Sequence, residues 1–249
     1  MTSSNSDASS YQSRAIPFLA AFNDIETHLR IALDAKRSDS FWWMVDRAVD
    51  KHLLSRQQGE VLKDYGNLHN AISHGRYHEG EPIAEPHPAV IEDIEMLRGI
   101  LMDPPRALSI LESTDVVTLT PASEVSKALR VIRLQGFAQI PIYEDHKFIQ
   151  LLTTNTISRW VAKDLADNNV LDARTIGDVL EMVKKIDDAV FLSRDITAQE
   201  AVDALINPDK NGRLPYAAIV TETGKRNERP LRIITSSDLA VLIEALNGR

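Results

Sequence analysis

The sequence predicts an α + α/β protein in which an N-terminal four-helix bundle is followed by two β-α-β-β-α repeats. Two observations lead to this fold class. Apolar residues recur at helical spacing from residue 17 to about residue 101, and after Asp103-Pro104-Pro105 short β-rich runs alternate with helical ones. A change of period at a proline-rich break is typical of a domain boundary. We therefore expect a helical domain over 15–102 and two repeats over about 103–168 and 172–249.

Composition narrows the class of protein. Residues 1–14 are rich in serine and nearly free of apolar side chains, which predicts a disordered tail. The chain has no cysteine, so it has neither disulfides nor a thiolate metal site, and a cytoplasmic location fits. No apolar run approaches the roughly 20 residues of a membrane helix, so we expect no membrane partner. The net charge of −8 argues against a broad nucleic-acid surface, and RNA is a partner that we do not favour.

Four helices are predicted before residue 102. The first follows Pro17, Ser40 can cap the second, Ser55 and Gln58 have capping-box spacing for the third, and Pro88 begins the fourth. Residues 75–88 form a loop rich in Gly and Pro. The apolar faces comprise Phe18, Phe22, Ile25, Leu29, Leu33, Phe41, Trp42, Val45, Val49, Val61, Leu62, Tyr65, Leu68, Ile72, Val90, Ile94, Leu97 and Leu101. In the run 41–44 one surplus aromatic residue is predicted to serve a dimer contact.

The later part of the chain reads as one pattern used twice. The first copy is predicted to have strands over 115–119, 138–143 and 148–153, with helices from Ser123 and over 156–167. The second copy is predicted to have strands over 189–193, 214–220 and 231–235, with a helix from Ala198 and a closing helix. A short helical lead precedes each copy, over 106–112 and 176–182. In this alignment Ala128 corresponds to Ala201, Pro141 to Pro215 and Thr153 to Thr235, and the extra residues of the second copy fall in the basic loop 223–230.

A polar tetrad follows the last predicted strand of each copy. In the second copy it is Thr235-Ser236-Ser237-Asp238, and in the first it is Thr153-Thr154-Asn155-Thr156. A threonine followed three residues later by an acid approximates a capping box, so the second tetrad alone predicts a helix cap with Thr235 at the N-cap. A carboxylate at a strand end can also accept hydrogen bonds from two vicinal hydroxyls. The first tetrad lacks that carboxylate.

The duplicated pattern resembles a tandem pair of cystathionine-β-synthase (CBS) domains, a Bateman module, over about residues 103–249. The resemblance rests on VVTLTPASEVSKALRVIRLQGFAQIPIYE in the first copy, and on VFLSRDITAQEAVDALI, LPYAAIV and LRIITSSDL in the second. It implies a two-fold pseudosymmetric module whose clefts take adenosine-containing ligands such as AMP, ADP, ATP or cyclic di-AMP. In this family the tetrad holds the ribose hydroxyls, which implies one strong site with Thr235 and Asp238.

The resemblance also implies candidate ligand-binding residues for both clefts. The tetrad positions are Thr235 and Asp238 in one cleft and Thr153 and Thr156 in the other. The base is expected near the start of each repeat and along 136–141, and the candidates are Val117, Thr118, Phe137, Ile140, Pro141, Leu192 and Pro215. Arg194, Arg213 and Arg232 are candidate phosphate contacts, although a surface arginine is more often simply solvated.

The segment LHNAISHG, residues 68–75, resembles the signature of HEPN-type four-helix domains. Asn70 and His74 match the polar residue and the histidine of that signature, while His69 stands where the family has arginine. Members with the full motif are often metal-independent RNases, so the resemblance implies His74, His69 and Asn70 as catalytic candidates. Since His69 is largely neutral at pH 7, its presence argues against phosphodiester cleavage. On a helical wheel Asn67, Asn70 and His74 share a polar face, which also suits a plain surface helix.

A metal site is not predicted. His69, His74, His78 and His87 lie close together in the sequence, but Gly75 and Gly80 interrupt helical spacing and no carboxylate completes a familiar site.

Together these patterns predict a regulatory protein that senses an adenine nucleotide through its CBS pair and relays it to the helical domain or to an effector protein. One alternative is a nucleotide-regulated HEPN-type RNase, and another is a structural dimerisation adaptor. A homodimer is expected through the CBS pair, the helical bundle or both.

Overall fold

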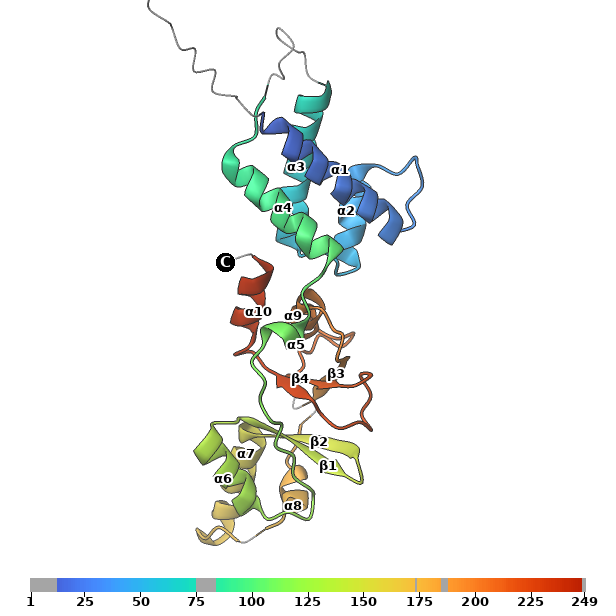
Figure 1. Ribbon diagram of the computed structural model, residues 1–249. Helices are drawn as coiled ribbons and strands as arrows, with labels where there is room; N and C mark the ends of the chain where they lie inside the picture. The colour runs from blue at the N-terminus through green and yellow to red at the C-terminus, as the bar shows by residue number, and fades with distance from the viewer. Residues whose placement is uncertain (1–12, 75–83, 173, 185–187, 248–249) are drawn as a thin grey trace, which may run out of the picture. The chain divides into compact units, whose positions relative to one another are not determined.

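The computed structural model describes residues 13–74, 84–172, 174–184 and 188–247 (Figure 1). The chain divides into two compact units, Met1–Pro104 and Pro105–Arg249, here called the helical unit and the mixed unit. Residues 1–12 of the predicted tail lie outside the described residues. Ser13 and Arg14 belong to the predicted tail, but Ser13 Oγ donates to Glu85 Oε1 at 2.6 Å and Arg14 N–H donates to Glu85 Oε2 at 3.2 Å. The folded part of the helical unit therefore begins before residue 15.

The described part of the helical unit contains α1 (Ala15–Ala32), α2 (Phe41–Asp50), α3 (Arg56–His74) and α4 (Pro88–Met102). The predicted caps are confirmed. Ser40 Oγ accepts from the Trp43 N–H at 3.2 Å. Ser55 N–H donates to Gln58 Oε1 at 2.8 Å while Gln58 N–H donates to Ser55 Oγ at 3.2 Å, which is a reciprocal capping box. Of the predicted loop 75–88, residues 75–83 lie outside the described residues.

The four helices share one apolar core built from the predicted faces. Phe22 of α1 is only 2% exposed and its ring contacts those of Phe18, Phe41 and His69. Trp43 is 44% exposed, so the run 41–44 does leave one aromatic side chain on the surface.

The mixed unit alternates helices and strands. In chain order it contains α5 (Ala107–Ile110), α6 (Val125–Gln135), β1 (Gln139–Glu144), β2 (Lys147–Thr153), α7 (Thr154–Asn168), α8 (Ile176–Leu180), β3 (Ala189–Ser193), α9 (Ala198–Ile206), β4 (Ala217–Thr221), β5 (Arg232–Ile234) and α10 (Leu239–Leu246). β1 pairs antiparallel with β2, and β4 lies between a parallel β3 and an antiparallel β5. Figure 1 shows α6 and α7 beside β1 and β2, where they enclose a common apolar core.

The predicted strand over 115–119 is wrong. In the second copy five residues of β3 pair with β4, whereas in the first copy only Leu119 forms a β-bridge, to Ile142. Val116 and Val117 are half-buried and line a pocket instead of joining a ladder. A β-branched run predicts extended backbone, but it does not show whether a partner strand is in reach.

Each lead helix packs on the copy that does not follow it in the sequence. α5 precedes the first copy but packs on α9 and α10 of the second, while α8 packs with α7 of the first. The same backbone bonds hold both leads: Ala107 N–H donates to Ile196 O at 3.0 Å and Ile176 N–H to Ser123 O at 2.8 Å. The core of each copy is therefore completed by the lead helix that precedes the other copy.

The strand register corrects one predicted correspondence. Ala128 and Ala201 occupy equivalent positions, four residues after the N-caps Glu124 and Thr197, and both are fully buried. Pro141, however, does not correspond to Pro215. Leu119 bridges Ile142, and its counterpart Leu192 pairs with Val220. Ile142 therefore aligns with Val220, and Pro141 aligns with Ile219. Pro215 lies before β4, because the second copy carries a longer loop there.

The loop between β4 and β5 is fastened by Glu228. Its carboxylate accepts from Thr223 Oγ1 at 2.5 Å and from the Thr223 N–H at 2.7 Å, and these bonds lower the pKa of Glu228 to about 2.

We expect the stability of the mixed unit to depend on this carboxylate in acid. Because the folded-state pKa lies below the ordinary value of 4.5, the contribution is present above that value and is lost as the pH falls towards about 2. Glu228→Gln should therefore flatten the decline in urea midpoint between these pH values. Glu244→Gln is the control, since the Glu244 side chain is exposed and its carboxylate has no hydrogen-bond partner among the described residues. An unaltered acid dependence in Glu228→Gln would contradict the prediction.

Candidate functional site

Three segments far apart in the sequence enclose a pocket of about 340 Å³ in the mixed unit. We call it the Asp238 pocket; it is lined by residues 114–117, 136–139, 232–233 and 235–238. Val116, Val117, Phe137 and Ile233 supply apolar wall, and the polar groups gather at the tetrad. An apolar pocket with a few convergent polar groups is the usual form of a small-molecule site.

The second-copy tetrad is a turn whose carboxylate points back to its own first residue. Asp238 Oδ2 accepts from the Thr235 N–H at 2.7 Å and from Thr235 Oγ1 at 3.2 Å. The Thr235 and Ser237 hydroxyl oxygens lie 2.7 Å apart. α10 begins only at Leu239 with Asp238 at its N-cap, so the prediction of Thr235 as N-cap is wrong. The turn bonds satisfy the strand end rather than the first turn of the helix.

Arg232 is paired with Asp238 in the lining of the pocket. Its Nη2 donates to Asp238 Oδ1 at 2.8 Å, and the two side chains are only 13% and 16% exposed. Its Nη1 donates to the Glu112 carbonyl and to Thr114 Oγ1. One guanidinium thus joins the tetrad to the segment that follows α5.

The first-copy tetrad is a helix cap and is sealed. Thr153 is the N-cap of α7, and its Oγ1 accepts from the Thr156 N–H at 3.1 Å. Thr156 Oγ1 accepts from Arg159 Nη2 at 3.1 Å, and both threonines are 0% exposed. The duplicated tetrads therefore have different roles: one caps a helix in the interior, and the other faces a pocket.

The predicted ligand-binding residues divide accordingly. Four of them line the Asp238 pocket: Val117, Phe137, Thr235 and Asp238. The first-copy tetrad residues Thr153 and Thr156 and the strand residues Ile140 and Pro141 are buried, and they lie outside both pockets described here, as do Thr118 and Leu192. Ile140 follows directly after the lining residues 136–139, but its side chain packs in the core of the first copy and so does not line the pocket.

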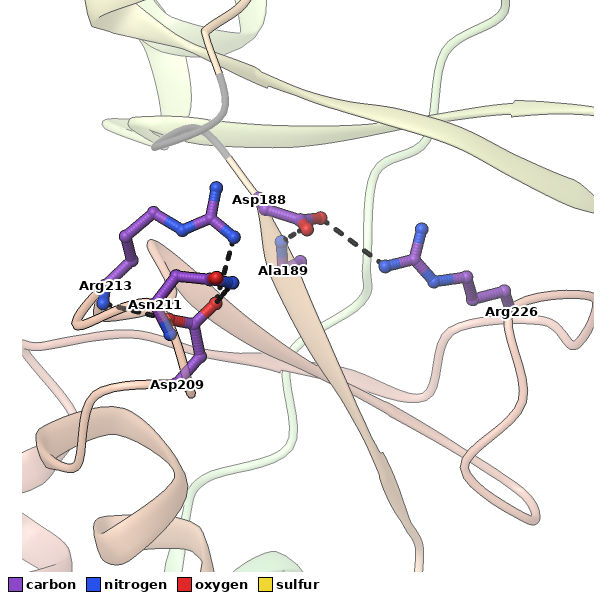
Figure 2. A network of polar contacts seen from close by, with 6 residues as sticks. All are labelled: Asp188, Ala189, Asp209, Asn211, Arg213 and Arg226. Carbon is purple, nitrogen blue, oxygen red and sulfur yellow. Dashed lines mark hydrogen bonds and ion pairs between the residues drawn. The ribbon is translucent and has the colours of Figure 1, made fainter.

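Pro215 lines a second pocket, of about 470 Å³, which also includes Asp188, Phe191, Asp209, Arg213 and Arg226. We call it the Asp188 pocket. Figure 2 shows Arg213 and Arg226 on opposite sides of Asp188, with the 209–213 turn beside Arg213. Arg226 lies over the Phe191 ring at 5.3 Å and pairs with Asp188 at 3.5 Å. Its carbonyl also accepts from the Phe148 N–H, so the β4–β5 loop contacts the first copy.

The carboxylates of Asp188 and Asp209 in the Asp188 pocket already accept hydrogen bonds from other groups of the protein. Asp209 accepts from the backbone N–H groups of Asn211 and Arg213 at 2.8 and 2.9 Å, and bonds of this kind lower its pKa well below the ordinary value. Asp188 accepts from the Ala189 N–H and from Arg226 (Figure 2). Within the described residues the Arg213 guanidinium donates to Asp209 through Nη2, so it retains free donors.

Among the candidate phosphate contacts that line a pocket, Arg213 keeps more of this capacity than Arg232. Arg194 pairs with Glu222 at 3.0 Å and lies outside both pockets. Arg232 lines the Asp238 pocket but is committed to Asp238, Glu112 and Thr114.

The RNase candidates lie in the last two turns of α3. Asn70 and His74 are exposed, as is Asn67, so the predicted polar face is confirmed. His69 turns inward, because its ring stacks on Phe22 with centroids 4.2 Å apart and its Nε2 lies 3.4 Å from Ser73 Oγ. Its ring therefore packs against the core of the helical unit. The three residues stay catalytic candidates by resemblance alone.

The sequence predicts neither a metal site among the histidines of 69–87 nor a membrane helix. His87 caps α4 through Nδ1, which accepts from the Ala89 N–H, and His78 lies outside the described residues. No group of three or more His, Asp or Glu side chains suited to a metal occurs in the described ranges. Within the same ranges, no helix has both the length and the apolar character that a membrane span requires.

Comparison with known proteins gave no matching family model and no matching curated protein. Similar solved structures include the CBS domain pair of protein MJ0100 in complex with 5′-methylthioadenosine and S-adenosyl-L-methionine, at 19% identity over 57% of this chain and 98% of that chain, with a TM-score of 0.40. CBSX2 in complex with AMP is 12% identical over 57% of this chain and 98% of that chain, with a TM-score of 0.38. A CBS-domain protein from Agrobacterium tumefaciens is 16% identical, covering 55% of this chain and 90% of that chain, with a TM-score of 0.39.

Sequence reasoning missed several residues of these pockets. Thr114 and Asp115 adjoin the predicted base-binding segment but carried no signal of their own. Arg226 lies in a loop treated only as an insertion. A basic loop beside a strand end, with an aromatic residue on a neighbouring strand, could have suggested it.

Proposed function

We propose that residues 105–249 form a CBS pair that binds one adenosine-containing ligand in the Asp238 pocket and acts as a regulatory sensor. The observation that carries this proposal is the meeting of residues 114–117, 136–139 and 232–238 around one pocket, with the tetrad carboxylate among its polar groups. The duplicated pattern supports it, since the start of one copy lies beside the tetrad of the other.

The tetrad can hold a ribose without losing its turn. A carboxylate has about four acceptor positions. Asp238 uses one on Oδ1 for Arg232 and two on Oδ2 for Thr235. One position on Oδ1 remains to accept from one ribose hydroxyl. The Ser237 and Thr235 hydroxyls can rotate to hydrogen-bond the adjacent ribose hydroxyl. Val116, Val117 and Phe137 offer apolar contact for the base.

The bonds of Arg232 suggest how occupancy would be relayed. Arg232 links Asp238 to Glu112 and Thr114, and α5 just before them packs on α9 and α10. The Pro105 carbonyl accepts from the Ala198 N–H at 2.8 Å, which ties the start of the mixed unit to the same core. A ligand that shares Asp238 would weaken the Arg232 link, and a state with a different α5 position would then be favoured. A ligand shifts such an equilibrium only through unequal affinity for the two states.

For the helical unit we propose a HEPN-like domain that serves as the responding or partner-binding part rather than as a nuclease. The inward packing of His69 supports this view. We further propose a homodimer, to which the exposed Trp43 would contribute. The effector is expected to be a protein.

The test is isothermal titration of adenosine and 5′-methylthioadenosine into the full chain, compared with Asp238→Asn. The asparagine keeps the size of the side chain and an acceptor for the Thr235 N–H but lacks the charge, so affinity should fall by about tenfold or more. Glu244→Gln on the same helix is the matched control and should bind as wild type. The absence of binding of any adenosine derivative to the wild type would overturn the proposal.

A further inference from the structure

The charges around the Asp238 pocket bear on which adenosine derivatives it accepts. Among the described residues that line it, Arg232 is the single cation, opposed by Asp115 and Asp238. Asp115 is exposed. Since Arg232 and Asp238 neutralise one another, the lining retains one negative charge.

Three of the five N–H donors of Arg232 are already used within the protein. Both Nη atoms already donate, to Asp238 on one side and to Glu112 and Thr114 on the other. Its Nε is buried and has no hydrogen-bond partner among the described residues. Rotating the guanidinium towards an anion would leave Asp238 unpaired while it is mostly buried, which is costly.

The start of α10 already has a negative charge beside it. A helix N-terminus attracts anions through its partial positive charge. Here the N-cap residue is Asp238 itself, so a carboxylate already lies at that end. Asp238 makes no side-chain bond to the first turn of α10, so it is the negative charge of its carboxylate that opposes an anion there. The neutral hydroxyls of the tetrad suit ligand hydroxyls better than a polyanion.

The pocket is also small. About 340 Å³ lies near the lower end of the roughly 300–1,000 Å³ typical of small-molecule sites. We infer that the Asp238 pocket selects adenosine derivatives whose 5′ substituent carries no phosphate, and discriminates against ADP, ATP and cyclic dinucleotides. This inference rests on the proposed function and narrows its ligand class. Asp115 and the Arg232–Asp238 pair are the specificity determinants.

The experiment compares 5′-methylthioadenosine, AMP, ADP and ATP by titration calorimetry on the full chain at low and physiological salt. We expect 5′-methylthioadenosine to bind about tenfold or more tightly than AMP, ADP or ATP, with the difference in affinity narrowing as salt screens the charges. Asp115→Lys should narrow the gap further by strengthening ADP binding, whereas the control Glu244→Gln should leave it unchanged.

The outcomes separate the two proposals. If ADP or ATP binds as tightly as 5′-methylthioadenosine and loses that affinity in Asp238→Asn, the selectivity is overturned while the adenosine site stands. If no derivative binds, the adenosine site itself is overturned. If ADP binding persists in Asp238→Asn but is lost in Arg226→Gln, the phosphates lie in the Asp188 pocket, and the selectivity of the Asp238 pocket is supported.

Discussion

Replacement of Asp238 by alanine is expected to lower the free energy of unfolding of the mixed unit by about 3–5 kcal/mol. The cause is not the lost pair itself, because two mostly buried opposite charges repay little more than the cost of removing them from water. It is the Arg232 guanidinium, which is 13% exposed in the intact pair and loses its counter-charge, together with the Thr235 N–H, which loses its acceptor. Chemical denaturation followed by circular dichroism measures the loss.

A double-mutant cycle isolates that cause. Arg232→Met removes the cation and keeps an apolar stem of similar length, and Arg232→Met with Asp238→Ala removes both charges. The double variant should be more stable than Asp238→Ala alone, since no buried charge is left unpaired. Adenosine binding should nevertheless stay weak in it, because the ribose acceptor is gone. If the double variant loses the sum of the single losses, Arg232 and Asp238 are not coupled and the assignment of the pair is wrong.

Replacement of Phe22 by alanine is expected to destabilise the helical unit by about 3–5 kcal/mol, the usual cost of deleting a buried aromatic side chain. Phe22 is 2% exposed and its ring contacts Phe18, Phe41 and His69, so the cavity opens at the junction of α1, α2 and α3. Thermal unfolding should show the helical unit melting earlier. Ligand binding in the mixed unit should persist.

Ile31→Ala on the same helix is the matched control. Ile31 is 77% exposed, so its truncation should change stability by less than about 0.5 kcal/mol. Equal effects of the two substitutions would contradict the packing of α1 described above.

Local chemistry made much of the fold predictable. Ser40, Ser55 and Gln58 identified helix starts because a cap depends on residues within one turn. The alternation of strands and helices after Pro105 was visible for the same reason. The strand over 115–119 failed because pairing requires a partner, and Val116 and Val117 have a pocket on that side instead.

The site was predictable to the level of segments but not of roles. Thr235 and Asp238 were identified by comparing the tetrad 235–238 with the corresponding tetrad 153–156 of the first copy. The commitment of Arg232 was not visible, since its partner Glu112 lies 120 residues away and no local pattern links them. Pro215 was misplaced for a related reason: a longer loop before β4 shifts the register, and only the β-ladder reveals the shift.

The exchanged lead helices have a consequence for synthesis on the ribosome. α5 is made first, but its apolar side chains remain uncovered until α9 and α10 follow, more than 85 residues later. The first copy cannot close its core until α8 has been made. Contacts across such separations slow folding, because a long loop must close before they form. We therefore expect the nascent mixed unit to stay unfinished until α10 has left the exit tunnel, with apolar surface that chaperones can bind meanwhile.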